Sequence, residues 1–450
     1  MRSDFSSTVI EILKYGGSTF AALLAGCVYT MTDAFFIGNW IGTDGLEAMA
    51  LIFPVTVIFA SLGVLFETGA SAVVSQEIGA GKTTLAEKIM RTNYVCGLLI
   101  GIIFVIAGNF FIEPLLALLA NNPEEYRIVE TAVDFLKIIL CGVPFLLTIY
   151  LTSTFMRCTE RPTHVFFFTG STALLNIILD ALFIIVFDWG MTGAATATFI
   201  SQASGALIAI WYFKYSKQKL ATSFGLSGLE YIATEFKIGA GFAIAALMSF
   251  VIEYLLNVIL LEYDAIHLLA ASTLSNVILT FVYLPLNGLD TGIQPLVSKL
   301  FAANQKQHCL RVMRFGFCLT IILTFIIYLP LMIFTEEIAG VFVDEGEAVT
   351  SEMITFLRLS FVMQPFVGLY TWLSGIMAAL EDEWRNVAIS LLPFVVQMPL
   401  IVFLPKMLPT EWVALSYAAQ DFAEAAVAFL LIRPFLKSNG ISFKQIFQVQ

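Results

Sequence analysis

Apolar stretches of about 20 residues recur along the whole chain between short polar turns, and each can cross a hydrocarbon core of about 30 Å as a helix. The pattern predicts an all-α polytopic membrane protein with twelve transmembrane helices. We expect these helices at residues 12–38, 46–76, 92–116, 129–156, 163–187, 192–214, 237–261, 268–298, 312–334, 350–380, 385–405 and 411–433.

Composition agrees with a membrane location. The hydrophobic fraction is 59% and only 13% of the residues are charged, whereas about one quarter of the residues are charged in a typical soluble domain. No polar stretch is long enough to form a soluble domain. A signalling receptor or sensor needs such a domain for its output, so the composition argues against that class of protein.

Basic residues are concentrated in the turns on one side of the predicted helices. Of the 23 Lys and Arg residues, only Arg127, Lys137, Arg358 and Lys406 fall on the other side. Lys and Arg accumulate in the cytoplasmic loops of membrane proteins. We therefore expect both termini to be cytoplasmic.

An internal repeat divides the chain into two halves. Glu67-Thr-Gly-Ala-Ser-Ala-Val-Val-Ser75 matches Asp290-Thr-Gly-Ile-Gln-Pro-Leu-Val-Ser298, and the stretch 135–145 matches 356–366, with offsets of 223 and 221 residues. Two matches in the same order predict two pseudo-symmetric six-helix lobes at 1–214 and 237–450, joined by a cytoplasmic linker at 215–236. Two such lobes with a cleft between them are typical of alternating-access transporters.

Charged residues within the predicted helices are candidates for function, because charge at bilayer depth is costly. Asp33 lies well inside the first helix, and Asn176 and Asp180 lie one turn apart on one face of the fifth. Two carboxylates and an amide can hold an alkali cation or share a proton. Hydrogen bonding between helices is the alternative role for Asn176 and Asp180.

The C-terminal half carries other polar residues at membrane depth. Glu253 and Asn257 lie one turn apart in the seventh predicted helix. They are candidates for lining the substrate cleft, together with the matched acidic residues Glu67 and Asp290. For Glu67 and Asp290, helix-packing hydrogen bonds are an equally good interpretation.

The last helix offers secondary acidic candidates. Asp421 and Glu424 are spaced i and i+3, so they share a helix face. The position that matches Asp180 in the second half is Ile401, which leaves that half without a carboxylate there. If there is one cation site, the N-terminal half is the better candidate.

No motif for enzyme chemistry is present. The three histidines are far apart, and the six cysteines lack metal-ligand or redox spacing. Gly79-Ala-Gly-Lys82-Thr83 is similar to the end of a phosphate-binding loop, but Gln76 stands where that loop needs its first Gly. We expect no enzyme activity, no cofactor, no nucleic-acid partner and no metal other than a coupling ion.

Several motifs resemble the multidrug and toxin extrusion (MATE) family, from about residue 10 to residue 435. They are Thr32-Asp-Ala-Phe-Phe-Ile-Gly-Asn-Trp-Ile-Gly-Thr43, Gly69-Ala-Ser-Ala-Val-Val-Ser-Gln-Glu-Ile-Gly-Ala-Gly-Lys82, Asn176-Ile-Ile-Leu-Asp180, Gly193-Ala-Ala-Thr-Ala-Thr198 and Gly292-Ile-Gln-Pro-Leu-Val-Ser298. The sequence is most similar to the prokaryotic branch with the DinF-like and MepA-like exporters. It departs from the family at Arg157-Cys-Thr-Glu160, where a Gly often takes the last position.

The resemblance implies secondary active efflux of amphipathic, cationic small molecules by antiport with H⁺ or Na⁺. It implies a monomer in a prokaryotic cytoplasmic (inner) membrane. Carried over by position, the coupling site is Asp33, Asn176, Asp180 and the hydroxyl of Thr198. The alternative is a flippase for lipids or lipid-linked oligosaccharides, which would favour a cationic cavity for pyrophosphate.

Reporter fusions test the predicted orientation. Green fluorescent protein joined after Lys219 should fluoresce and alkaline phosphatase at the same point should be inactive, because that segment is expected to be cytoplasmic. After Glu345, in the acidic loop, the two reporters should behave in the opposite way. The reversed result at both points would place the termini outside the cell.

Overall fold

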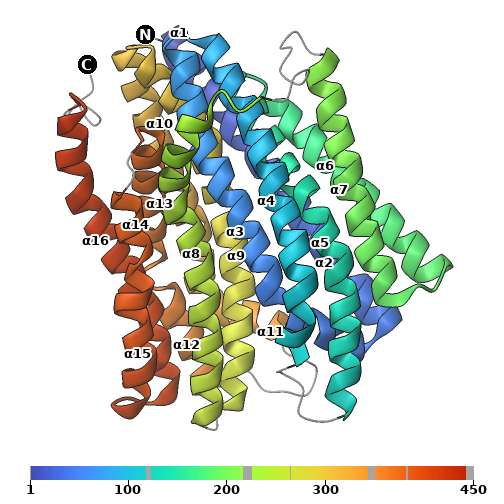
Figure 1. Cartoon of the computed structure of the whole chain (residues 1–450). Coiled ribbons are helices and arrows are strands. Elements are labelled where there is room, and N and C mark those ends of the chain that lie inside the picture. The colour runs from blue at the N-terminus through green and yellow to red at the C-terminus, as the bar shows by residue number, and fades with distance from the viewer. Residues whose placement is uncertain are drawn as a thin grey trace. The chain divides into compact units, whose positions relative to one another are not determined.

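The computed structural model describes residues 2–117, 123–215, 225–263, 265–342, 350–381 and 384–441. These residues form helices and turns, and no β-strand occurs among them (Figure 1). Eleven helical segments are long and apolar enough to cross a membrane. The 37-residue helix α9 (Ile266–Ala302) lies where the eighth span was predicted, so the expected twelve-helix membrane fold is confirmed.

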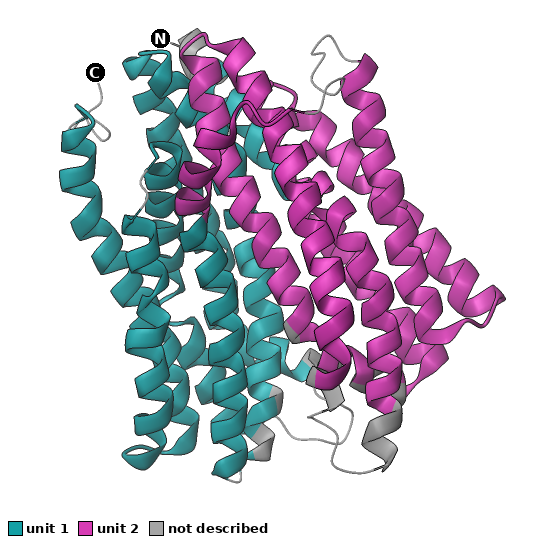
Figure 2. Cartoon of the chain, viewed as in Figure 1, with its two compact units in different colours: residues 1–20, 240–450 teal, residues 21–239 magenta. Residues whose placement is uncertain are grey.

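The chain divides into two compact units, residues 1–20 with 240–450 (unit 1) and residues 21–239 (unit 2) (Figure 2). The first twenty residues thus pack with the C-terminal half of the chain. The lobe boundaries 1–214 and 237–450 stay a prediction, and residues 216–224 of the predicted linker lie outside the described residues.

Unit 2 contains most of the first six spans and the start of the seventh. Helix α5 is its centre and packs against α3, α4, α6 and α7. The helices of this unit are α2 (Ser18–Phe36), α3 (Thr43–Gly79), α4 (Thr83–Ala117), α5 (Pro123–Cys158), α6 (Pro162–Asp180), α7 (Gly190–Tyr215) and the first turns of α8 (Leu229–Glu262).

Unit 1 contains the remaining spans, and α13 lies at its centre against α9, α10 and α16. Its helices are α1 (Arg2–Ile12), the rest of α8, α9, α10 (Lys306–Ile333), α11 (Thr335–Phe342), α12 (Ser351–Phe361), α13 (Gln364–Ala379), α14 (Arg385–Ser390), α15 (Met398–Phe403) and α16 (Leu415–Ser438).

Two predicted continuous helices of unit 1 are interrupted. The tenth span breaks between α12 and α13, where Pro365 follows Gln364, and the eleventh is divided by a π-helical segment, Pro393–Gln397. Proline lacks a backbone N–H and crowds the preceding turn, so a helix breaks or widens there. The breaks turn polar groups at membrane depth toward neighbouring helices.

The internal repeat extends to the backbone of the turns. Gly81 and Asn304, which are 223 residues apart, have φ of 79° and 56° at the ends of α3 and α9. Glu160 and Glu381 are 221 residues apart and have φ of 65° and 61°. Left-handed backbone is uncommon for residues with side chains, so its recurrence at both offsets supports the repeat independently of the matched residues.

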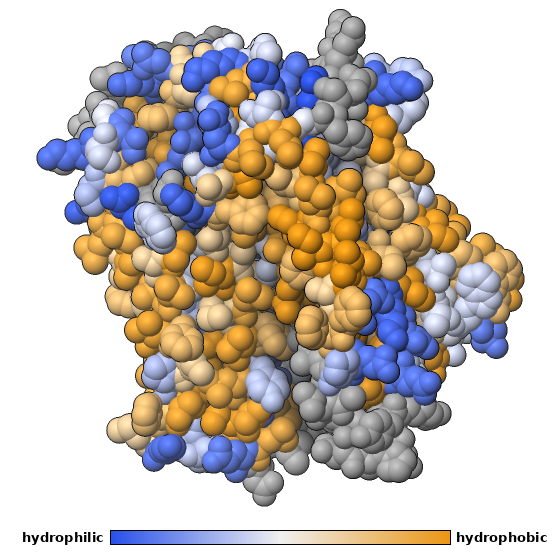
Figure 3. Space-filling view, viewed as in Figure 1, coloured by the Kyte–Doolittle hydropathy of each residue, from blue (hydrophilic) through white to orange (hydrophobic). Residues whose placement is uncertain are grey.

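The surface fits a bilayer. On the face in Figure 3, apolar side chains cover the middle of the helices, and hydrophilic side chains gather mainly toward helix ends. Large apolar side chains are exposed, among them Phe110 at 73%, Phe167 at 71% and Leu430 at 70%. An apolar surface of this kind is stable in contact with lipid rather than water.

Helices α3 and α8 approach each other closely in unit 2. A Cβ atom on Gly239 would collide with the backbone oxygen of Leu65, and one on Gly69 would collide with the backbone oxygen of Glu235. Small residues that let backbones touch are a common means of packing helices in membranes.

Replacing Gly239 tests this contact. Gly239→Ala should lower stability by about 1–3 kcal/mol, because the methyl group meets backbone that cannot move aside. Thermal unfolding of purified protein in detergent measures the loss. Gly170→Ala is the matched control, since a Cβ on Gly170 of α6 meets nothing within 4 Å. Equal melting of both variants would contradict the close approach.

Candidate cation site

Unit 2 brings the two predicted carboxylates of the N-terminal half together. Asp33 lies near the end of α2, just before the π-helical segment Ile37–Ile41, and Asp180 is the last residue of α6. Their carboxyl groups lie within hydrogen-bonding reach of one another. Asp180 is fully buried, whereas Asp33 is partly exposed.

Asn176 joins the two acids to α7. Its amide nitrogen faces both carboxylates, 3.0 Å from Asp33 Oδ1 and 3.2 Å from Asp180 Oδ2. The opposite corner of the amide lies 3.3 Å from Thr198 Oγ1 on α7. In this orientation the amide donates toward the acids and its oxygen accepts from the Thr198 hydroxyl. The four residues expected to form one site are therefore neighbours, brought together by three helices.

Neither acid has a fixed positive partner. Asp33 and Asp180 form no ion pair with Lys or Arg in the described part of the chain. Asp180 Oδ1 is buried and receives no hydrogen bond. Two adjacent carboxylates at low dielectric resist joint ionisation. The arrangement can therefore hold a shared proton, or bind a monovalent cation that supplies the missing charge.

Tyr29 is a site residue that the sequence reasoning missed. It lies one turn before Asp33 on α2 and faces both Asp33 and Asp180. Its spacing of four residues from Asp33 was the available signal, because i and i+4 share a helix face. The phenol adds a hydroxyl donor to the wall of the site.

Glu67 has the packing role rather than an open position in a cleft. Its side chain forms an ion pair with Arg157 inside unit 2, where Arg157 is 2% exposed. Arg157 also donates to Thr154 Oγ1 at 3.2 Å. The sequence reasoning did not pair Glu67 with Arg157, since the two residues lie on different helices and 90 positions apart.

The three other candidates for the substrate cleft lie in unit 1 and do not form one cluster. Glu253 accepts hydrogen bonds from Ser272 Oγ at 3.1 Å and from the Tyr417 hydroxyl at 3.2 Å. Asn257 lies one turn further along α8, and its Oδ1 is buried without a donor.

Asp290 is held against a different helix. It packs on Gly375 of α13 and lines an internal cavity of about 20 Å³ with Gln294, Thr320 and Trp372. Such a volume suits a single water molecule. At the position matched to Glu67, the second half therefore has a carboxylate without an arginine beside it among the described residues.

Asp421 and Glu424 lie on α16 in unit 1, and they are 3% and 4% exposed. Their partners include Gln364 of α13, which sequence reasoning missed. The repeat contained the signal, because Gln364 stands where the N-terminal half has the apolar Val143.

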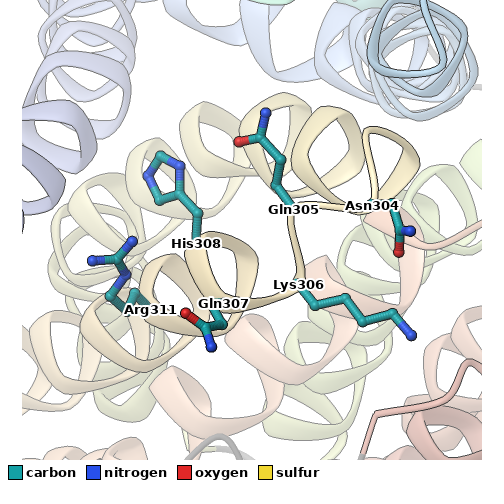
Figure 4. Close-up of a pocket in the computed structure, with 6 residues that line it drawn as sticks. All are labelled: Asn304, Gln305, Lys306, Gln307, His308 and Arg311. Atoms are coloured by element: carbon teal, nitrogen blue, oxygen red, sulfur yellow. The ribbon is translucent and has the colours of Figure 1, made fainter.

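The most open hollow lies apart from all these acids. Asn304, Gln305, Lys306, Gln307, His308 and Arg311 line it at the turn between α9 and α10 (Figure 4). His308 Nε2 lies 3.0 Å from Glu11 Oε2 within unit 1. None of the expected site residues lines this hollow, and no group of three His, Cys, Asp or Glu able to hold a metal occurs among the described residues.

Comparison with known proteins places these features in a family. The MatE family model matches residues 19–182 and 242–403, which correspond to the two halves of the repeat. The chain belongs to the MatE family. The resemblance stated from the motifs is therefore confirmed, and the protein is a multi-pass membrane transporter.

Relatives and solved structures agree with the family. The multidrug export protein MepA of Staphylococcus aureus is 25% identical over 91% of this chain and 90% of its own, and MepA of Staphylococcus saprophyticus is 23% identical over the same shares. The MATE transporter VcmN of Vibrio cholerae, in a bent form, superposes with a TM-score of 0.86 at 20% identity, over 97% of this chain and 99% of its own. A MOP superfamily transporter of Pyrococcus furiosus has a TM-score of 0.86 at 17% identity, over 96% of each chain.

The family also explains one backbone feature. Glu160 takes the position where MATE proteins often have Gly, and it keeps the left-handed φ of 65° that Gly adopts freely. The turn after α5 thus retains its geometry despite the substitution.

Removing Arg157 tests the buried pair in unit 2. Arg157→Leu should lower stability by about 3–5 kcal/mol, because it leaves the Glu67 carboxylate buried without a partner. The double variant Glu67→Gln/Arg157→Leu should recover part of the loss in thermal unfolding.

Lys137→Leu provides the matched control. It removes a cation from Glu113, 3.1 Å away, but these side chains are 38% and 66% exposed. Such a pair contributes less than about 1 kcal/mol. If Lys137→Leu were as damaging as Arg157→Leu, the assigned role of the buried pair would be wrong.

Proposed function

We propose that this MatE-family transporter exports amphipathic, cationic organic compounds in exchange for a monovalent cation, H⁺ or Na⁺, by alternating access. The observation that carries the proposal is the pair of neighbouring carboxylates, Asp33 and Asp180, without a fixed positive partner. The relatives named multidrug export protein support the export of diverse compounds. The basic loops support a cytoplasmic membrane location with both termini inside.

The site can respond to a cation because its parts lie on separate helices. Asp33 belongs to α2, Asn176 and Asp180 to α6, and Thr198 to α7. With both acids ionised, their repulsion favours separation of α2 from α6; neutralisation of one charge removes that repulsion. A cation that binds one arrangement more tightly than the other shifts the transporter between them.

The membrane potential can drive this exchange. One elementary charge moving inward across 100 mV supplies about 2.3 kcal/mol. A released organic cation moving outward opposes part of that energy, so coupling depends on how many inorganic cations enter in each cycle. The export of a monovalent drug against one monovalent cation would be electroneutral.

A flippase for lipids or lipid-linked oligosaccharides is not favoured by the buried charges. A pyrophosphate group requires cationic partners. The unpaired charges described inside both units are carboxylates, and the buried Arg157 is already paired with Glu67. We therefore retain antiport of organic cations as the proposed function.

Substitution of the two acids tests this proposal. In pump-deficient bacteria, Asp33→Asn and Asp180→Asn should each reduce the efflux of ethidium or norfloxacin to background, because an amide cannot gain and lose the coupling charge. Efflux is measured at fixed external pH with and without Na⁺; dependence on Na⁺ would identify the ion. Thr198→Val should have a smaller effect, since it removes a hydroxyl but no charge.

Asp188→Asn is the matched control, because Asp188 is exposed beyond the end of the same span. Its efflux should equal that of the wild type at equal expression. Full efflux by both Asp33→Asn and Asp180→Asn would reject the coupling site. No efflux by the well-expressed wild type, with any of a panel of cationic dyes, would reject the substrate class.

A further inference from the structure

A second pair of buried acids lies in unit 1. Asp421 and Glu424 are spaced i and i+3 on α16, so their side chains leave the same helix face. They are only 3% and 4% exposed. Burying two ionised carboxylates without compensation is too costly for a folded protein.

The groups that face the pair are polar but uncharged or acidic. From α13, Gln364 Nε2 donates to Asp421 Oδ2 at 3.2 Å, and the phenol of Tyr370 faces Glu424. From α9, the phenol of Tyr283 faces both acids. On α16 itself, Gln420 Nε2 lies 3.4 Å from Glu424 Oε1.

The basic residues of the elements packed on α16 are engaged or exposed elsewhere. Arg358 of α12 is exposed, and the guanidinium of Arg385, on α14, lies over the ring of Phe435, 5.1 Å from its centroid. Phe435 is about three helical turns from Glu424. Neither Asp421 nor Glu424 forms an ion pair in the described part of the chain.

Two buried oxygen atoms at this place have no donor. Gln364 is 1% exposed and its Oε1 accepts no hydrogen bond, and the same is true of Glu424 Oε2. A buried acceptor left without a partner costs about 1–3 kcal/mol. The amide oxygen is independent of the acidic pair, and both atoms are hard oxygen ligands of the kind that alkali cations and protons use.

We propose that Asp421, Glu424 and the amide oxygen of Gln364 form a second monovalent-cation site, inside unit 1. The cation, H⁺ or Na⁺, neutralises one charge of the pair and satisfies the oxygens that have no donor. The hydroxyl groups of Tyr283 and Tyr370 complete the polar wall.

Glu253 extends this polar region toward α8. Tyr417 precedes Asp421 by one turn on α16, and its hydroxyl donates to Glu253 Oε2 at 3.2 Å. Tyr417, Asp421 and Glu424 therefore lie at i, i+4 and i+7 along one stripe of the helix. Hydroxyl and carboxyl groups in such a series can pass a proton along the helix, which gives the buried pair a route for exchange.

The second site deepens the proposed antiport and rests on it for its role in transport. With a site in each unit, two cations enter for each exported monovalent compound. The cycle is then electrogenic, and the membrane potential contributes about 2.3 kcal/mol per 100 mV for the additional charge. Binding of the cation itself can be measured without transport.

Equilibrium binding of ²²Na⁺, and carboxyl protonation by infrared difference spectroscopy over a pH titration, test the site on the purified full-length protein. Asp421→Asn/Glu424→Gln should remove about half of the bound Na⁺, or half of the titrating carboxyl signal if H⁺ is the ligand. Asp33→Asn/Asp180→Asn should remove the other half. The combined variant should retain neither.

Two further variants separate binding from folding. Gln364→Leu preserves both carboxylates but removes the amide oxygen, so it should weaken Na⁺ binding in unit 1 by about tenfold, the change for 1.4 kcal/mol. Glu262→Gln, which changes an exposed carboxylate at the end of α8, should leave both signals unchanged. Thermal unfolding identifies any variant that fails to fold, and Gln364→Leu then provides the test.

The outcomes for the two sites are distinct. Unchanged Na⁺ binding and an unchanged carboxyl signal in folded Asp421→Asn/Glu424→Gln would overturn the second site, whatever the transport activity. Loss of the signal in that variant alone, with none lost in Asp33→Asn/Asp180→Asn, would support the unit 1 site and reject the coupling site proposed in unit 2.

Discussion

The cost of an uncompensated charge in hydrocarbon governs the polar structure of this protein. Each buried acid must find a positive partner, a proton or a bound cation. Glu67 has a permanent partner in Arg157, and this pair can only stabilise the fold. Asp33 and Asp180 have none, so their charge has to be balanced by something that can enter and leave. The same physical requirement thus separates structural acids from exchangeable ones, and it does so by the presence or absence of one neighbouring guanidinium.

The sequence predicted the helices well because a bilayer demands long apolar runs, and this requirement is local. It also placed Asn176 and Asp180 on one helix face, since that too is a local spacing. It did not predict the ion pair of Glu67 with Arg157 or the contact of Gln364 with Asp421. Those depend on which helices pack together, and helix packing in membranes uses small residues and shape rather than a readable pattern. The grouping of Glu253, Asn257 and Asp290 failed for the same reason.

The two halves of the repeat have kept their backbone more closely than their chemistry. The left-handed residues of the turns recur, even with Asn304 in place of Gly81. In contrast, Asp180 is matched by Ile401, and the acids of the second half lie on α16 instead. A turn has few allowed conformations, whereas a buried charge can be supplied by any helix that reaches the same interior. Divergence of the halves therefore moves the charged groups among helices without changing the path of the chain.

The amide of Asn176 determines which cation suits the site in unit 2. With its nitrogen toward Asp33 and Asp180, it stabilises negative charge by hydrogen bonds, so one shared proton completes the set. Sodium requires the amide oxygen to face inward, because an N–H group cannot ligate a cation. The Thr198 hydroxyl can either donate or accept at 3.3 Å, so it can follow that rotation without losing its partner. A half-turn of one amide, rather than a different set of residues, thus separates a proton site from a sodium site.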